Sequence, residues 1–112
     1  MLVLFDHGTP KGLARALSGH SIQTAQSRGW DTLDNGALLN AAEEAGFAVL
    51  LTTDRLIRYQ QNLASRRISL VVLTGWSRVR HHADRIAAVV AAATPGSYSE
   101  VEIPFDAKPG RP

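Results

Sequence analysis

The sequence predicts an α/β fold, a three-layer α/β/α sandwich around a central, mainly parallel sheet of four to five strands. Three observations predict this fold. Short apolar runs typical of buried strands alternate with longer segments typical of helices. The length of 112 residues fits one domain, and because the chain has no cysteine, its core must fold without disulfides. No internal repeat or low-complexity segment indicates a different architecture.

The first elements are a strand, a helix and a second strand. Residues 2–5 are apolar throughout, which is typical of a strand buried on both faces. Thr9 followed by Pro10 is typical of a helix start, and Gly19 is expected to end this helix. The partial alternation over residues 20–25 then predicts the second strand.

The middle of the chain continues the same alternation. A helix is predicted over residues 36–45, with Gly46 as its stop. Residues 47–51 give the strongest strand pattern in the chain, because all five are apolar. A polar helix or helical turn over 55–63 and an apolar strand over 70–73 follow.

The last elements complete the predicted domain. An alanine-rich helix is predicted over residues 78–93, and Pro95 with Gly96 ends it. An edge strand is predicted over 101–103. Residues 106–112 have few apolar side chains and predict a disordered tail, so the domain is expected to span residues 1–105.

Charge is distributed unevenly along the chain. Residues 1–54 carry three Lys or Arg against six Asp or Glu, a net charge of −3, whereas residues 55–85 carry seven against one, a net charge of +6. Such a basic segment can attract a polyanion, although solvated helix surface is the commoner explanation for arginines of this kind. No apolar run is long enough to cross a bilayer and no basic leader precedes Asp6, so a cytoplasmic protein without membrane association is expected.

Two acidic residues follow predicted strands. Asp6 comes directly after the first strand, and Asp54 follows the apolar strand over 47–51. Because parallel strands end at the same edge of a sheet, these two carboxylates are expected to meet there, and a hard divalent cation would relieve their repulsion. Each also has an ordinary explanation, since Asp6 suits a turn and Asp54 suits a helix cap.

Four motifs, in this order, resemble the short bacterial PIN-like domains. They are FDHGTP over residues 5–10, the pair Gly19 and His20, LDNGALLNAA over 33–42, and LLTTD over 50–54. The resemblance covers about residues 1–75, more loosely to Ile103, and implies the same three-layer fold. It also implies metal-dependent RNA cleavage and a small antitoxin protein as a partner.

The resemblance assigns roles to three acidic positions. Asp6 matches the first metal-binding acid and Asp54 the acid of the last motif. Strict spacing places the middle position at Asn35, yet Asp34 beside it is the acid, so Asp34 is taken as the third catalytic and metal-binding residue. Mg²⁺ or Mn²⁺ held there would generate a hydroxide nucleophile and neutralise phosphate charge.

Two departures from the family pattern bear on activity. His7 stands where the family usually has Glu, and the segment RLIRYQQN after Asp54 lacks a second acid. Water or a neutral amide must then replace a charged ligand, and Asn62, Gln60 and Gln61 are candidates for this role.

Cations near the expected site predict polyanion binding. Arg55 and Arg58 follow Asp54 directly, and Lys11 follows the first motif. These three residues are the predicted contacts to RNA phosphates.

Three functions are therefore carried forward. The first is a Mg²⁺- or Mn²⁺-dependent ribonuclease that acts as the toxin of a toxin and antitoxin pair. The second is a PIN-like module that binds RNA or a partner without cleavage. The third is an assembly role, with a homodimer formed through the alanine-rich last helix. The adjacent His81 and His82 do not have the spacing of a zinc site, and Trp30 and Trp76 are expected to cover the core.

Overall fold

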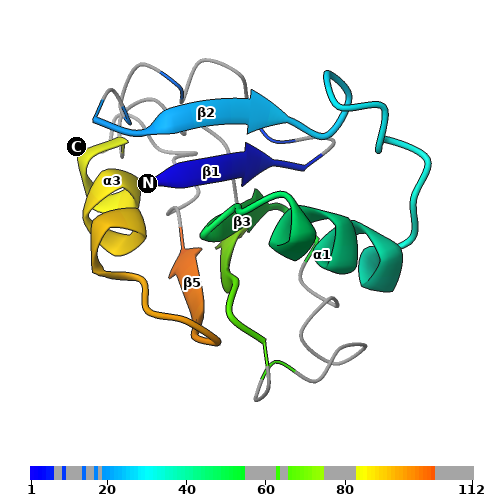
Figure 1. Cartoon of the computed structure of the whole chain (residues 1–112). Helices are drawn as coiled ribbons and strands as arrows, with labels where there is room; N and C mark the ends of the chain where they lie inside the picture. Colours follow the sequence, from blue (N-terminus) through cyan, green and yellow to red (C-terminus); the bar gives the residue numbers. More distant parts are fainter. Residues whose placement is uncertain are drawn as a thin grey trace.

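The structure describes most of the predicted domain, including five strands and two helices. The computed structural model (Figure 1) describes residues 1–6, 9, 14, 17, 19–54, 63, 66–74 and 83–102. These contain the strands β1 (Leu2–Phe5), β2 (Ser21–Thr24), β3 (Val49–Thr52), β4 (Ser69–Thr74) and β5 (Tyr98–Glu102), and the helices α1 (Asn35–Glu44) and α3 (Ala83–Ala92). The predicted tail over 106–112, the residues between 54 and 63, and the start of the predicted last helix over 78–82 lie outside the described residues.

The five strands form one sheet in the order β2-β1-β3-β4-β5, and all four pairings are parallel. The predicted α/β fold with a parallel sheet is thus confirmed. From β1 the chain first adds β2 on one side and then returns to add β3 on the other. The connections therefore diverge between β1 and β3, and in open parallel sheets this switch point is where ligands bind, beyond the carboxyl ends of the strands.

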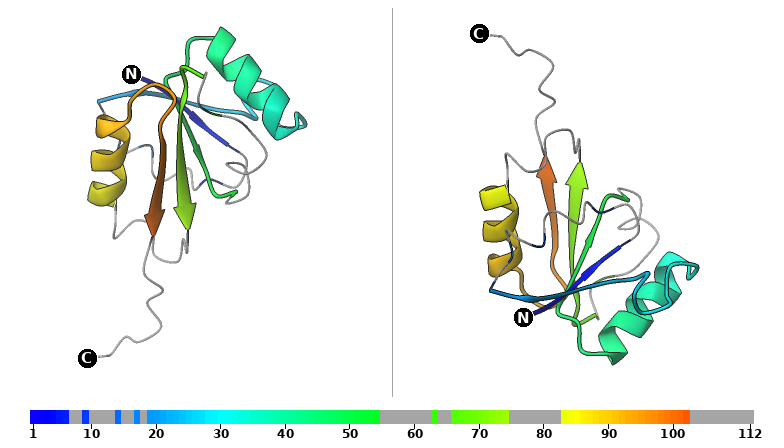
Figure 2. Two further views of the ribbon diagram at one scale, coloured as in Figure 1. Left: turned by 90° about the horizontal axis from the view of Figure 1, so that it is seen from below. Right: turned by 90° about the horizontal axis from the view of Figure 1, so that it is seen from above.

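Helices cover both faces of the sheet. Figure 2 shows α1 on one side of the sheet and α3 on the other. Because side chains alternate along a strand, Val3 and Phe5 of β1 face the α3 side whereas Leu4 faces the α1 side. The core on the α3 side includes Leu17, Val71, Leu73, Ile86 and Val90, and the core on the α1 side includes Leu38, Leu39, Ala42, Leu50, Leu70 and Val72.

Helix α1 starts and stops where the sequence predicts. The carboxylate of Asp34 caps its start by accepting a hydrogen bond of 2.8 Å from the backbone N–H of Ala37. Gly46 follows its end with a φ of 90°, a conformation that glycine adopts at little cost. Phe47 was predicted to open the next strand, but β3 begins at Val49. Phe47 instead is buried under α1 and donates its N–H to Ala42.

The end of α1 is tied to the start of β4 by a network around Glu43. Its carboxylate accepts hydrogen bonds from the Arg66 guanidinium at 2.9 Å and from the backbone N–H groups of Arg67 and Ile68 at 2.6 and 3.2 Å. Burial acts to raise the pKa of Glu43, but the backbone hydrogen bonds from Ile68 and Arg67 and the charge of Arg66 outweigh it, so the pKa is lowered. We call these four residues the Glu43 network.

The last strand begins earlier than expected. The predicted edge strand over 101–103 is observed as β5 (Tyr98–Glu102), parallel to β4. Val101 is buried, whereas Tyr98 and Glu100 join their side chains through a hydrogen bond of 2.6 Å. In the part of the chain that the structure describes, no helix has both the length and the apolar character that a membrane span requires.

Candidate functional site

Asp6 and Asp54 both lie at the carboxyl edge of the sheet, beside the switch point. Asp6 directly follows β1 and Asp54 lies two residues after β3, the strand next to it. Phe5 pairs with Leu51 in the β1–β3 register, and the N–H of Asp6 extends the ladder with a hydrogen bond of 2.9 Å to the Leu51 carbonyl. The register therefore brings Asp6 opposite Thr52, the last residue of β3.

Thr52 connects the two acidic residues. Its hydroxyl donates to the Oδ2 atom of Asp6 at 2.8 Å and accepts a hydrogen bond of 3.1 Å from the backbone N–H of Asp54. The side chain of Thr52 is fully buried, whereas Asp6 and Asp54 are half-buried. One immobile hydroxyl thus fixes the Asp6 carboxylate and the backbone from which the Asp54 side chain extends.

Helix α1 supplies the fourth member of this group. The side-chain amide of Asn35, the first residue of α1, donates to the Oδ2 atom of Asp54 at 3.1 Å. Asp6, Thr52, Asp54 and Asn35 therefore form a continuous hydrogen-bonded group, which we call the rim cluster. It joins the carboxyl ends of β1 and β3 to the first residue of α1.

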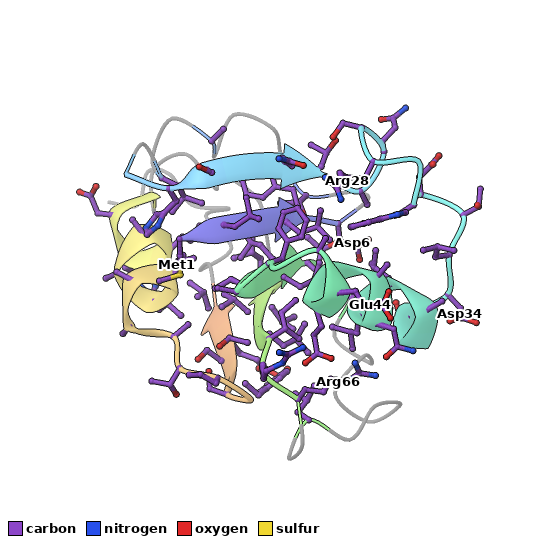
Figure 3. All side chains as sticks on the ribbon, in the orientation of Figure 1. Met1, Asp6, Arg28, Asp34, Glu44 and Arg66 are labelled. Atoms are coloured by element: carbon purple, nitrogen blue, oxygen red, sulfur yellow. The ribbon has the colours of Figure 1, made fainter. Side chains whose placement is uncertain are left out.

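Asp34, the third predicted acid, has a different observed role. Its carboxylate caps α1, and the residue is exposed. Figure 3 shows Asp34 at the outer start of α1, whereas Asp6 lies at the end of β1. Asp34 and Asn35 were the two candidates for the middle position. Of these, Asn35 is the one whose described hydrogen bond reaches Asp54.

Five other predicted site residues lie outside the described residues. They are His7, Lys11, Arg55, Arg58 and Asn62. The roles predicted for them remain predictions: His7 replaces a ligand, Lys11, Arg55 and Arg58 contact RNA phosphates, and Asn62 substitutes for the missing ligand.

The rim cluster presents oxygen donors of the kind that hard cations prefer. Two carboxylates and one amide supply oxygen atoms, and each carboxylate offers about four acceptor positions, so a hydrogen bond from Thr52 is compatible with a cation on the same group. Among the described residues, no group of three or more His, Cys, Asp or Glu side chains is arranged to hold a metal ion. The oxygen donors of the described cluster are two carboxylates and one neutral amide.

In comparisons with protein-family models, curated proteins and solved structures, no match to this chain reaches significance. The structure itself shows a small α/β fold with a parallel five-stranded sheet.

Sequence reasoning missed Thr52 as a member of the site. A threonine inside a mostly apolar strand gives no separate indication of function, and only the β1–β3 register places it opposite Asp6. The available indication was its place at the end of this strand, close to the edge of the sheet where Asp54 lies. Thr9 was predicted to cap a helix, most of which lies outside the described residues, and its hydroxyl donates a hydrogen bond of 3.0 Å to the Leu51 carbonyl.

Proposed function

We propose that this chain is a Mg²⁺- or Mn²⁺-dependent ribonuclease of PIN-like type, the toxin of a toxin and antitoxin pair. The observation that carries the proposal is the rim cluster, in which Thr52 connects Asp6 and Asp54 although 48 positions separate them in sequence. The four sequence motifs support the PIN-like assignment.

The position of the cluster supports ligand binding independently of that resemblance. It lies beyond the carboxyl ends of β1 and β3, where the strand order diverges. Two carboxylates at the ends of neighbouring strands supply the oxygen ligands that divalent cations prefer. This arrangement is suited to binding a cation.

Each residue of the rim cluster has its own role in the proposed reaction. Asp6 and Asp54 would hold the cation with the side-chain oxygen of Asn35, and Thr52 keeps Asp6 in one orientation. A divalent cation supplies a nucleophilic hydroxide at neutral pH and neutralises charge on the phosphate. The amide of Asn35 holds the Asp54 carboxylate through its N–H, so that the same side chain orients one ligand and supplies another.

A second function is favoured by one specific observation. The position next to Asp54 on α1 is the neutral Asn35, and Asp34 caps the helix instead. With two carboxylates in the described cluster, cation binding is weaker than with three. A module that binds RNA without cleaving it is therefore the alternative, and it predicts retention of RNA at all metal concentrations with no product.

The test combines RNA cleavage with thermal melting. Wild-type protein is incubated with single-stranded RNA in Mg²⁺, in Mn²⁺ and in EDTA, and is melted under the same conditions. We expect cleavage with either cation and none in EDTA. Because a ligand that binds only the folded state stabilises it by about 2.7 kcal/mol at 100 times its Kd, we also expect the cations to raise the melting temperature.

Variants assign both effects to the rim cluster. Asp54→Asn and Asp6→Asn should remove cleavage and the melting response together, since each replaces a charged ligand by a neutral one. Asp84→Asn is the matched control, because Asp84 is an exposed acid in the first turn of α3, on the other face of the sheet. Melting that is independent of cations, together with cleavage that persists in Asp54→Asn, would refute the proposal.

A further inference from the structure

Arg28 is a cation that the sequence-based predictions did not include. It lies in the turn after β2, and its guanidinium carbon is 4.7 Å from the centroid of the Trp30 ring and 5.6 Å from that of Phe47. Both distances fall within the range of cation–π contact. Trp30 and Phe47 also contact each other, with ring centroids 6.0 Å apart and planes at 75°. An exposed arginine is therefore held over a pair of aromatic rings.

The turn that carries Arg28 is itself well defined. The N–H of Ser27 donates to the Thr24 hydroxyl at 3.0 Å, and the hydroxyl of Ser27 donates to the Thr24 carbonyl at 2.8 Å. Gly29 adopts a φ of 77°, which lets the chain turn back so that the N–H of Trp30 donates to Ala25. The backbone under Arg28 is thus fixed before any ligand binds.

The contacts of Arg28 leave its hydrogen-bonding capacity largely unused. Stacking on Trp30 occupies a face of the guanidinium, whereas its five N–H groups point outward in the plane. One of them donates to the side-chain oxygen of Gln23 at 3.3 Å. Within the described residues, Arg28 forms no ion pair with a carboxylate, and Asp31 three positions away is exposed. Such a planar fork is suited to a phosphate group.

Arg28 lies on the same side of the sheet as the rim cluster. Trp30 and Phe47 belong to the α1 side of the core, and the alternation along β3 places Thr52 on that side as well. The turn of Arg28 continues β2 beyond Thr24, which pairs with Phe5, the residue before Asp6. Figure 3 shows Arg28 at the carboxyl end of β2, the strand beside the one that ends at Asp6.

We infer that Arg28 is a phosphate-binding residue that holds the backbone of a single-stranded RNA beside the rim cluster. This inference rests on the proposed function, because RNA is the substrate class proposed there. Trp30 and Phe47 hold the guanidinium in place, so little side-chain freedom is lost on binding. The negative rim cluster and the positive Arg28 then serve different parts of one strand, the first through a cation and the second directly.

The experiment measures binding of fluorescein-labelled single-stranded RNA in EDTA by fluorescence anisotropy over a series of salt concentrations. Arg28→Gln should weaken binding about tenfold, and it should reduce the slope of log K against log salt by about 0.7, the value for one phosphate contact on a single strand. Arg85→Gln is the matched control, because Arg85 is exposed on α3 at the other face, and we expect its binding to equal that of wild type.

A second variant keeps the inference testable if Arg28→Gln does not fold. Arg28→Lys retains the charge but lacks the planar fork, so binding should weaken while the salt slope stays unchanged. Wild-type affinity and slope in both Arg28 variants would overturn the inference, as would a wild-type protein that does not bind RNA.

The same samples separate this inference from the proposed function. They are transferred from EDTA into Mn²⁺ and assayed for cleavage. Weaker binding by Arg28→Gln without cleavage by wild type supports the role of Arg28 and refutes the nuclease. Cleavage by wild type with unchanged binding by both Arg28 variants supports the nuclease and refutes the role of Arg28.

Discussion

Polar side chains tie both ends of helix α1 to the sheet, but the two groups of side chains differ in the charges that they contain. At its end, the Glu43 network joins a carboxylate to the guanidinium of Arg66 and to two backbone N–H groups. At its start, the rim cluster joins the Asp6 carboxylate to the backbone of Asp54 through the Thr52 hydroxyl, and it joins the Asp54 carboxylate to the side-chain amide of Asn35. Figure 3 shows Arg66 beside the helix and Asp6 at the end of β1.

We expect this difference to separate a polar group that stabilises the fold from one that binds a ligand. The charge of Glu43 is compensated within the protein, and its lowered pKa shows that the folded state stabilises the ionised form. Among the hydrogen bonds described for the rim cluster, the donors to the Asp6 and Asp54 carboxylates are the neutral hydroxyl of Thr52 and the neutral amide of Asn35. We therefore expect substitutions in the Glu43 network to act on folding and substitutions in the rim cluster to act on binding and chemistry.

The largest effect is expected from Glu43→Ala. The substitution leaves the N–H groups of Arg67 and Ile68 and the charge of Arg66 without their carboxylate, and the side chains of Glu43 and Arg66 are each only 15% exposed. We expect a loss of about 2–3 kcal/mol in the free energy of unfolding, measured by urea denaturation. The control Glu44→Ala removes an exposed neighbour and should cost less than about 0.5 kcal/mol. Equal losses in both variants would remove the distinction between the two ends of α1.

Thr52→Val tests the rim cluster at the start of α1. Valine matches threonine in shape but lacks the hydroxyl that orients Asp6, so we expect a loss of about tenfold in RNA cleavage, equivalent to about 1.4 kcal/mol. Thr52→Ser retains the hydroxyl and should recover most of the rate. A positioning role is contradicted if Thr52→Val keeps the activity and Thr52→Ser loses it, because valine retains the methyl group without the hydroxyl and serine retains the hydroxyl without the methyl group.

A smaller effect is expected at the start of α1. Asp34→Ala removes the cap on the N–H of Ala37 and should lower stability by about 1 kcal/mol. Asp34→Asn retains a good cap and should keep both stability and cleavage. Loss of cleavage in Asp34→Asn would instead make Asp34 the third metal ligand, as the sequence motif implied.

The smallest effect is a dependence of stability on pH. The pKa of Glu43 is lowered from its ordinary value of 4.5, so its contribution is fully present above pH 4.5 and is lost as the pH falls towards the lowered value in the folded state. Thermal melting of wild type and Glu43→Gln between pH 7 and pH 3 measures this contribution. We expect the difference between the two proteins to shrink on acidification, and a constant difference would contradict the role assigned to the carboxylate.

The fold could be predicted because its signals are local. The apolar run of residues 2–5 and the stop at Gly46 each indicate their structure within a few positions, and the bounds predicted for β1 and α1 lie within about two residues of those observed. The start of β3 was misplaced because Phe47 is apolar in either role. Phe47 is buried because it packs under α1, and it does not belong to the hydrogen-bonded strand β3.

The site was predicted only in part because it depends on register. Asp6 and Asp54 could be placed at one edge from the direction of parallel strands alone. The role of Thr52 depends on which residue of β3 faces Asp6, and the choice between Asp34 and Asn35 depends on the first turn of α1. The position of Arg28 over Trp30 and Phe47 joins a turn to a residue 19 positions away, which no local pattern indicates.

Binding of Mn²⁺ measured by electron paramagnetic resonance tests the central claim, that the rim cluster gathers two carboxylates to hold a divalent cation. Wild type, Asp34→Asn and the double variant Asp6→Asn/Asp54→Asn are titrated under identical conditions. We expect wild type and Asp34→Asn to bind Mn²⁺ with the same affinity, and we expect no binding by the double variant. Absence of binding by wild type, or binding by the double variant with wild-type affinity, would contradict it.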